Sequence, residues 1–294
     1  MDKHASFEVV PSAKDPRSAP LLTRHMEPCE AFRALVHECV NQLLANGKSL
    51  RTSAEAEPLH KMRVAIRKIL SLFFCFRAIL PQPEAAEVRE RLKYIFKTLG
   101  AVRSLDVLLV MLQNVGASVA FQDEIGALER AQRMALRKAL RMLQSQRFET
   151  DIARLLAFVD AEDWTPREEA LDAFVTHMFE RQWRRFRKCG GLLDLDMYER
   201  HQVRLRVKKL RYTCEFFGDL ICRKNGRRRL AQFRKCLNRL QVLLGDLNDR
   251  AAAQDHVSIG LWHEVAARQK RSDAKLLKMA DAAQAKLVAQ KKFW

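Results

Sequence analysis

Two short stretches of this 294-residue chain carry a histidine followed by cations at helical spacing. One stretch reads HKMRVAIRK from His60, and the other reads HQVRLRVKKLR from His201. An α-helix advances by about 3.6 residues per turn, so residues three and four apart share a face. Each stretch therefore predicts a row of basic side chains on one helix face: His60, Arg63 and Arg67 in the first, and His201, Arg204, Lys208 and Arg211 in the second.

Neither basic row contains an acidic residue. A solvated helix face ordinarily mixes acids and bases four residues apart, and that ordinary surface is the alternative reading of any charge run. Cations without nearby acids repel one another unless a partner neutralises them. Arginine forms bidentate hydrogen bonds with phosphate, lysine supplies a point charge, and protonated histidine also donates. The two rows thus predict a site for a phosphate-rich anion.

The composition agrees with an anionic partner and with a helical fold. The formal net charge is +18 and the pI is near 10.0, which favours nucleic acid, an acidic membrane surface or a phosphate polymer as partner. Hydrophobic residues make up 48% of the chain, while there are only 10 Gly and 8 Pro. Strong helix formers dominate, and no segment alternates with the period of a strand. We therefore predict an all-α protein.

Apolar residues at three- and four-residue spacing set the expected elements. They predict helices over about 28–46, 58–80, 84–99, 104–115, 122–144, 148–159, 166–188, 195–222 and 227–244, with two more towards the C-terminus. Glycines at 47, 100 and 245 are expected to end helices. Residues 1–24 are polar and rich in proline, and they predict a mobile tail.

An internal repeat organises the remainder of the chain. The segment that begins at His60 matches the one that begins at His201, 141 residues later. Downstream, LKYIFKTLGAVRSLD from Leu92 matches LNRLQVLLGDLNDRA from Leu237, with an offset of 145. Two blocks in the same order predict duplication of a helical unit, so residues 25–294 are expected to form one domain of two repeats, about 25–160 and 161–294.

The second matched block adds residues beside the expected helix breaks. Arg103 matches Asn248, and each follows a glycine by three residues. Both are expected in loops that bring a side chain towards the site. Asp106 and Asp249 either orient a neighbouring Arg or Lys or cap helices, and capping is the role we expect, because aspartate is a preferred N-cap residue.

The seven cysteines are scattered and form no CxxC pair. This usage is typical of a reducing compartment and of buried thiols, and no His/Cys cluster has the spacing of a metal site. No cofactor is expected. The N-terminal segment lacks the features of a signal peptide, and no run of about 18 apolar residues would span a membrane. We therefore expect a cytoplasmic protein without membrane contact.

These motifs together resemble the CHAD family, the conserved histidine α-helical domains. The resemblance depends on H-x-x-R-x-x-x-[RK]-K at His60 and at His201, and on LGAVRSLD at Leu99 and LLGDLND at Leu243. It covers the chain from about residue 25 onward. It implies two pseudo-symmetric four-helix bundles around a shared basic cavity. It also implies binding of inorganic polyphosphate, association with polyphosphate granules, and these anion ligands: His60, Arg63, Arg67, Lys68, Arg103, His201, Arg204, Lys208, Lys209 and Arg211.

The chain departs from the family pattern in its first half. Leu70 stands where the second half has Arg211, and Ser104 stands where the family often has aspartate. The first half is therefore expected to bind more weakly than the second. The triphosphate-processing domain that often accompanies such domains has no counterpart in this chain, which is expected to be a stand-alone module.

Two other functions compete with this prediction. Nucleic-acid binding fits the net charge, but aromatic residues do not alternate with the cations as stacking platforms would, and no zinc-finger or RNA-binding motif is recognisable. An enzyme of phosphoryl transfer would need carboxylates for Mg²⁺, and the basic rows have none, so we expect no enzymatic activity. The basic runs at 130–141 and 181–188 either extend the site or form ordinary surface. The sequence sets neither a preferred chain length nor an oligomeric state.

Overall fold

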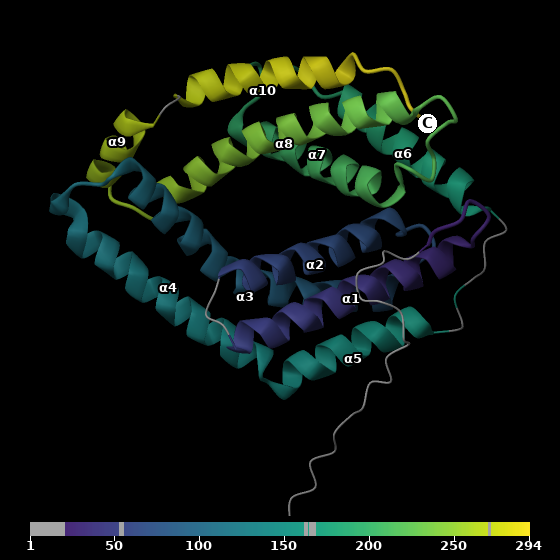
Figure 1. The fold of residues 1–294 in the computed structure, drawn as a ribbon, viewed down its shortest axis with the longest axis horizontal. Coiled ribbons are helices and arrows are strands. Elements are labelled where there is room, and N and C mark those ends of the chain that lie inside the picture. Colours follow the sequence, from purple (N-terminus) through teal and green to yellow (C-terminus); the bar gives the residue numbers. More distant parts are fainter. Residues whose placement is uncertain (1–20, 53–55, 162–163, 165–168, 270–271) are drawn as a thin grey trace, which may run out of the picture.

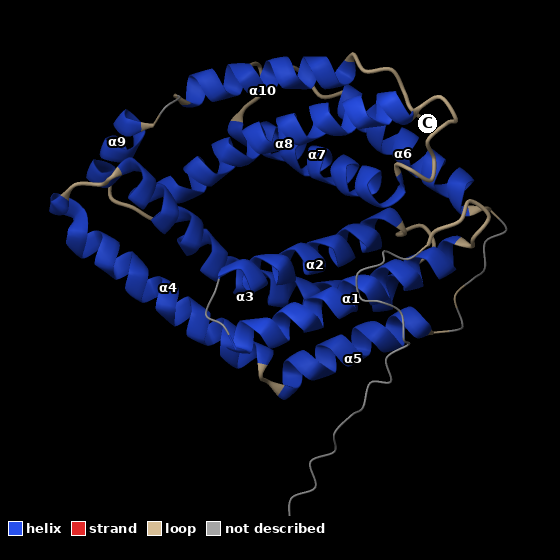
Figure 2. Ribbon diagram, in the orientation of Figure 1, coloured by secondary structure: helices blue, strands red, loops and turns tan. Residues whose placement is uncertain are grey.

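The protein is all-α, as the sequence predicts. A computed structural model describes residues 21–52, 56–161, 164, 169–269 and 272–294, and this part of the chain contains ten α-helices, one short 3-10 turn and no strand (Figure 2). Two layers of helices lie on either side of the centre of the molecule (Figure 1). The site therefore has to be built from helix faces.

The first layer is made by the N-terminal half. It contains α1 (Pro28–Thr52), α2 (Ala56–Cys75), α3 (Gln82–Val115) and α5 (Gln146–Asp160), which pack pairwise on one another. The long helix α3 extends beyond this layer. Its far end carries the 3-10 turn Val119–Phe121 and packs along α4 (Gln122–Leu143), which leads back towards α5 (Figure 1).

The second layer is made by the helices of the C-terminal half. It contains α6 (Leu171–Arg187), α7 (Met197–Phe217), α8 (Arg227–Gln254) and α10 (Asp273–Val288), with α9 (Ile259–Arg268) between the last two. Helix α7 packs between α6 and α8, and α8 packs on α10. The layers meet where α2 contacts α7 and where α3 contacts α9.

One hydrophobic core joins both layers at the α2–α7 contact. Phe76 on the first layer meets Phe217 edge-on, with ring centroids 5.8 Å apart, and Phe76 also stacks with Phe174 of α6. Beside them, Cys75 Sγ lies 3.4 Å from the hydroxyl of Thr213, and both residues are fully enclosed. This packing fixes α2 against α7, the two helices that carry the basic rows.

A second contact closes the opposite corner, and we call it the corner latch. The carboxylate of Glu264 accepts hydrogen bonds from the backbone and hydroxyl of Ser118 at 2.6 and 2.9 Å. Reciprocally, Glu124 accepts from the backbone and hydroxyl of Ser258 at 2.6 and 2.8 Å. The two segments, SVAFQDE and SIGLWHE, lie 140 residues apart and share a serine and a glutamate at the same spacing, beyond the two blocks matched in the sequence.

The helix breaks expected at three glycines are wrong. Helix α1 continues through Gly47 to Thr52, α3 runs through Gly100, and α8 runs through Gly245. Glycine costs a helix interior only about 1 kcal/mol, which the burial of flanking leucines outweighs. The described glycine with positive φ is Gly116, which ends α3 at φ 61°.

Other helix ends differ by several residues from those expected. Helices α2 and α7 end at Cys75 and Phe217, five residues early, and turns follow them. Helix α6 begins at Leu171, while the expected start at Pro166 lies outside the described residues, as do residues 1–20 of the expected tail. Arg24, within that expected tail, donates from its guanidinium to the carbonyl of Cys222 at 3.0 Å.

Candidate anion-binding site

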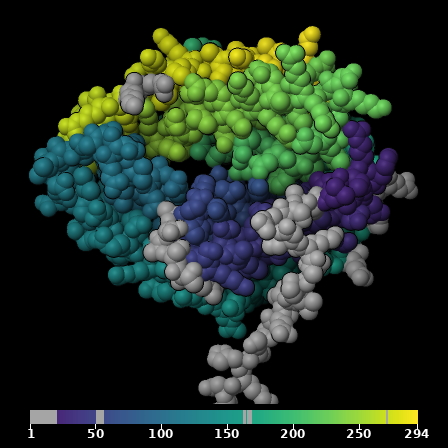
Figure 3. All heavy atoms as spheres, viewed as in Figure 1, coloured from purple at the N-terminus to yellow at the C-terminus, as the bar shows by residue number. Residues whose placement is uncertain are grey.

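Basic side chains from three helices gather between the layers. We call this group the central cluster, and its members are His60, Arg63 and Arg67 of α2, Arg103 of α3, and Arg204 and Lys208 of α7. Arg67 links the halves, because its charge acts on both Arg204 and Lys208. The space-filling view is hollowed between the two layers that supply these helices (Figure 3).

Burial and mutual repulsion disfavour the charged forms of the central cluster. Burial, and after it the charges of Arg204 and Arg67, lower the pKa of Lys208 to about 7. Burial, Arg67 and Arg103 together lower the pKa of Arg63 to about 10. The pKa of His60 is also lowered, first by burial and then by Arg103. An anion placed among these groups would relieve both effects.

Two residues of α3 hold the guanidinium groups in place. The ring of Phe96 lies below Arg63 and Arg67, whose guanidinium carbons are 4.7 and 5.6 Å from its centroid. A Cβ on Gly100 would approach Arg63 Nη1 to 2.6 Å, so this glycine provides the space that the guanidinium occupies. Gly100 therefore serves the site as a helical glycine rather than as a helix end.

Some buried guanidinium donors have no acceptor. Arg63 Nη1 and Arg204 Nε are shielded from solvent, yet neither finds a hydrogen-bond partner among the described residues. A buried donor without an acceptor is costly, and for a charged group the cost is larger still. The oxygens of an anion would satisfy both donors.

The contacts between the rows follow the 141-residue offset. Arg63 corresponds to Arg204 and Arg67 to Lys208, and the charges act across the pairs Arg67–Arg204 and Arg63–Lys208. Lys68 and Lys209 likewise correspond. Lys68 pairs with Glu215 of α7 and Lys209 lies over Phe74 of α2, and these two partners are also 141 residues apart. This exchange is what a pseudo-two-fold relation between α2 and α7 would give, while the duplication itself stays a prediction.

Lys68 and Arg211 are both paired with an acid, Glu215, that lies outside the basic row predicted from the sequence. Glu215, one turn beyond Arg211, lies 2.9 Å from Lys68 Nζ and 3.0 Å from Arg211 Nη1. Arg211 also stacks over Tyr212, with 4.2 Å from its guanidinium carbon to the ring centroid. The basic row predicted from the sequence ends at Arg211, and the compensating carboxylate stands at the next position on the same helix face.

Lys209 belongs to a different group of cations, the flanking cluster, whose other members are Arg185, Arg206 and Arg89. Its Nζ lies 4.1 Å from the ring centroid of Phe74. Burial lowers its pKa, and so do the charges of Arg185, Arg206 and Arg89. Arg185 comes from the basic run at 181–188, so part of that run lies beside a predicted ligand.

Other candidates are placed away from the central cluster. His201 is exposed on the first turns of α7. In the basic run at 130–141, Arg133 lies 3.8 Å from Glu129 on the same helix, in the mixed-charge pattern of a solvated surface. Nothing places that run against the central cluster.

The predicted loop and capping roles of four residues are wrong, because α3 and α8 are continuous. Arg103 and Asn248 lie within these helices rather than in loops. Asp106 accepts from the Gln132 amide at 3.0 Å inside α3. Asp249, inside α8, raises the pKa values of Lys208 and Arg204, while Glu57 of α2 raises that of His60. Helix continuity thus brings Arg103 and Asp249 to the site.

The described residues contain neither a candidate metal-binding group nor a candidate membrane-spanning helix. No group of three His, Cys, Asp or Glu side chains among them is arranged to hold a metal ion. None of the described helices combines the length and apolar character needed to cross a membrane. The cations of the central cluster and their open hydrogen-bond donors can bind an anion through charge and hydrogen bonds.

Known proteins share this arrangement of helices. A family model described as the CHAD domain matches residues 34–258. The uncharacterized proteins MT2285 and Rv2226 of two Mycobacterium tuberculosis strains are each 26% identical over 253 residues, which is 78% of this chain and 45% of each relative. This chain therefore spans less than half the length of these relatives.

Two solved structures have the same fold. The crystal structure of the CHAD domain from the plant Ricinus communis matches with a TM-score of 0.69 and 22% identity, over 93% of this chain and 96% of that chain. PptA from Streptomyces chartreusis matches with a TM-score of 0.58 and 16% identity, over 89% and 98% of the respective chains.

Proposed function

The chain belongs to the CHAD domain family, and we propose that it binds inorganic polyphosphate through the central cluster. The observation that carries the proposal is the set of six basic side chains held together between the layers, on which two acids act, Asp249 on Arg204 and Lys208 and Glu57 on His60. Arg63 and Arg204 each retain a buried donor without an acceptor. Such a site stores repulsion that a multivalent anion removes.

The chemistry of polyphosphate fits these groups. Every residue of the polymer carries negative charge and exposed oxygens, so one chain can meet several cations in succession. The guanidiniums of Arg63, Arg67 and Arg204 are suited to bidentate phosphate contacts. Lys208 and His60 have lowered pKa values in the free protein, and each would gain a proton when phosphate approaches.

The proposal extends to place and to turnover. Binding to the polymer would bring the protein to polyphosphate granules in the cytoplasm, and a fluorescent fusion tests this by its co-localisation with stained granules. We expect binding without hydrolysis, because the central cluster lacks a pair of carboxylates for Mg²⁺. Release of free phosphate from polyphosphate with Mg²⁺ would contradict that expectation.

A titration of fluorescent polyphosphate against salt tests the binding itself. The affinity should fall steeply, with a log–log slope of about −4 if six cations each displace a counterion from a flexible chain. Arg63→Gln with Lys208→Gln should weaken binding strongly. The control is Lys275→Gln with Lys278→Gln, which removes the same charge from the exposed side of α10.

The competing reading is tested in the same titration. Duplex and single-stranded DNA, added at equal phosphate concentration, should displace polyphosphate poorly. Equal displacement by DNA, or an affinity that is independent of salt, would refute the proposal and favour nucleic-acid binding or no electrostatic site at all.

A further inference from the structure

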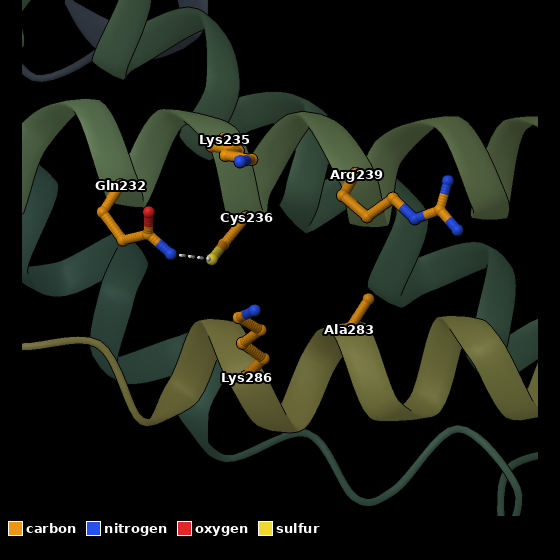
Figure 4. A pocket seen from close by; sticks show the side chains of 6 residues that line it. All are labelled: Gln232, Lys235, Cys236, Arg239, Ala283 and Lys286. Carbon is orange, nitrogen blue, oxygen red and sulfur yellow. Dashed lines mark hydrogen bonds between the residues drawn. The ribbon is translucent and has the colours of Figure 1, made fainter.

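A second basic groove lies on the second layer, between α8 and α10. It is lined by Gln232, Lys235, Cys236, Arg239, Ala283 and Lys286, and offers about 400 Å³ of space that is partly open to solvent (Figure 4). Three of these residues are cations, they come from both helices, and no acid lines the groove. We call it the outer groove.

The outer groove contrasts with the remainder of the α8–α10 contact. Farther along the same helix pair, Arg250 of α8 meets Asp273 of α10 at 2.7 Å. The other acid of α10, Asp281, lies beside Gly191, away from the groove. Around Lys286, packed helices instead bring like charges together, which costs free energy unless an anion is present.

The floor of the outer groove adds a neutral donor. Gln232 Nε2 lies 3.7 Å from the sulfur of Cys236, which is buried at 5% exposure (Figure 4). Sulfur is a weak acceptor, so this amide is held towards the groove with little hydrogen-bond energy committed. An oxyanion would be a stronger acceptor for the same N–H.

We propose that the outer groove binds one phosphate group of a small anion, independently of the central cluster. A compact phosphate would meet the ammonium group of Lys286 and the amide of Gln232, and Lys235 and Arg239 would add positive charge at the rim of the groove (Figure 4). The groove is open on one side, so the remainder of the ligand can extend into solvent. Either a free anion such as pyrophosphate or the end of a polyphosphate chain presents this group.

Calorimetric titration of the full chain with pyrophosphate tests the proposal. Lys235→Gln with Lys286→Gln should lower the affinity about tenfold or more, since charge-assisted hydrogen bonds are lost. The matched control, Lys275→Gln with Lys278→Gln, removes the same charge from the exposed side of α10 and should bind as the wild type does. Should the double variant fold poorly, Arg239→Gln alone is measured and should lose affinity in the same direction.

A central-cluster variant separates this site from the proposed function. Arg63→Gln with Lys208→Gln should lose polyphosphate affinity but keep pyrophosphate binding at the outer groove. If the groove variant also loses polyphosphate affinity, chain ends are the source of the phosphate group, and if not, free anions are. Pyrophosphate affinity that is unchanged in the groove variant, or that disappears with the central cluster alone, overturns the proposal.

Discussion

Replacing Lys208 by Gln is expected to stabilise the free protein and to lower its affinity for polyphosphate. Burial and the charges of Arg204 and Arg67 lower the pKa of Lys208 to about 7, from an ordinary value of 10.5. The unfolded chain keeps that ordinary value. Between these two pH values the unfolded state therefore binds more protons than the folded state, and stability rises with pH.

The size of the effect follows from the two pKa values. The difference is equivalent to about 5 kcal/mol at full strength, with each unit worth about 1.4 kcal/mol. Lys208 is partly exposed, so solvent screens the repulsion, and we expect about 2 kcal/mol. The penalty is complete below pH 7, declines as the pH rises from 7, and vanishes above 10.5.

Thermal melts across this pH range measure the penalty. At pH 7 the Lys208→Gln variant should melt about 4 °C above the wild type, given the size of the chain. The difference should shrink towards pH 10, where the wild-type lysine is neutral. Lys278→Gln, which removes an exposed lysine of α10, should show neither effect.

Calorimetry of ligand binding at pH 8 gives a second, independent readout. The lowered pKa of Lys208 leaves part of this group neutral in the free protein at pH 8, so polyphosphate should drive a measurable uptake of protons at this group. Titrations in buffers of different ionisation enthalpy count those protons. A variant that melts lower than the wild type, with unchanged proton uptake, would show that Lys208 is a structural residue and refute the reasoning.

Three further substitutions test the surroundings of the site. Gly100→Ala should lower polyphosphate affinity by roughly three- to tenfold without a change of charge, because the new methyl group displaces the Arg63 guanidinium; unchanged affinity would mean that this guanidinium does not bind. Glu215→Gln should raise the affinity a few-fold, since it releases both cations that the carboxylate pairs, and a loss of affinity would show that it positions them instead. Hydrogen bonds from Ser118 lower the pKa of Glu264, so the stability this carboxylate contributes is present above its ordinary pKa of 4.5 and lost as the pH falls through its lowered value. Glu264→Gln should accordingly lower the melting point by a few degrees at pH 7 and less at pH 3, and an equal loss at both would contradict the latch.

The helical class and the basic rows were predictable because both depend on local periodicity. Apolar residues at helical spacing placed the helices, and the same spacing put Arg63 and Arg67 on one face. Glycine, however, is ambiguous when read locally. At Gly100 the deciding factor is the guanidinium of Arg63 from another helix, and no periodicity reveals that contact.

The composition of the site was harder to predict because it depends on contacts between helices. The rows looked free of acids along the chain, yet Asp249 reaches Lys208 from α8 and Glu215 reaches Lys68 from across the layers. The contact of the Phe96 ring with Arg63 and Arg67 was not predictable for the same reason. One further feature could have been found in the sequence. Ser118 and Ser258 are each followed by a glutamate at the same spacing, and these residues form the corner latch.

Glu215 and Asp249 change which half of the chain is expected to bind polyphosphate more strongly. By formal charge the second half should bind more strongly, because Arg211 stands where the first half has Leu70. Arg211, however, is already paired with Glu215. Asp249 acts on Arg204 as well, which further reduces the attraction that the second half offers to an anion.

In the first half, no acid among the described residues contributes to the shifted pKa of Arg63. Arg63 is lowered in pKa by burial and by other cations alone, and Arg103 adds a charge that Asn248 does not supply in the second half. Removing two charges at Arg63 and Arg67 should therefore cost more polyphosphate affinity than removing two at Arg204 and Arg211. Each pair is changed to Gln and titrated at the same salt concentration, because screening alters both values. A larger loss from the second half would mean that the bound chain displaces Glu215 and Asp249 from their cations, so that formal charge, rather than pairing in the free protein, sets the energy of binding.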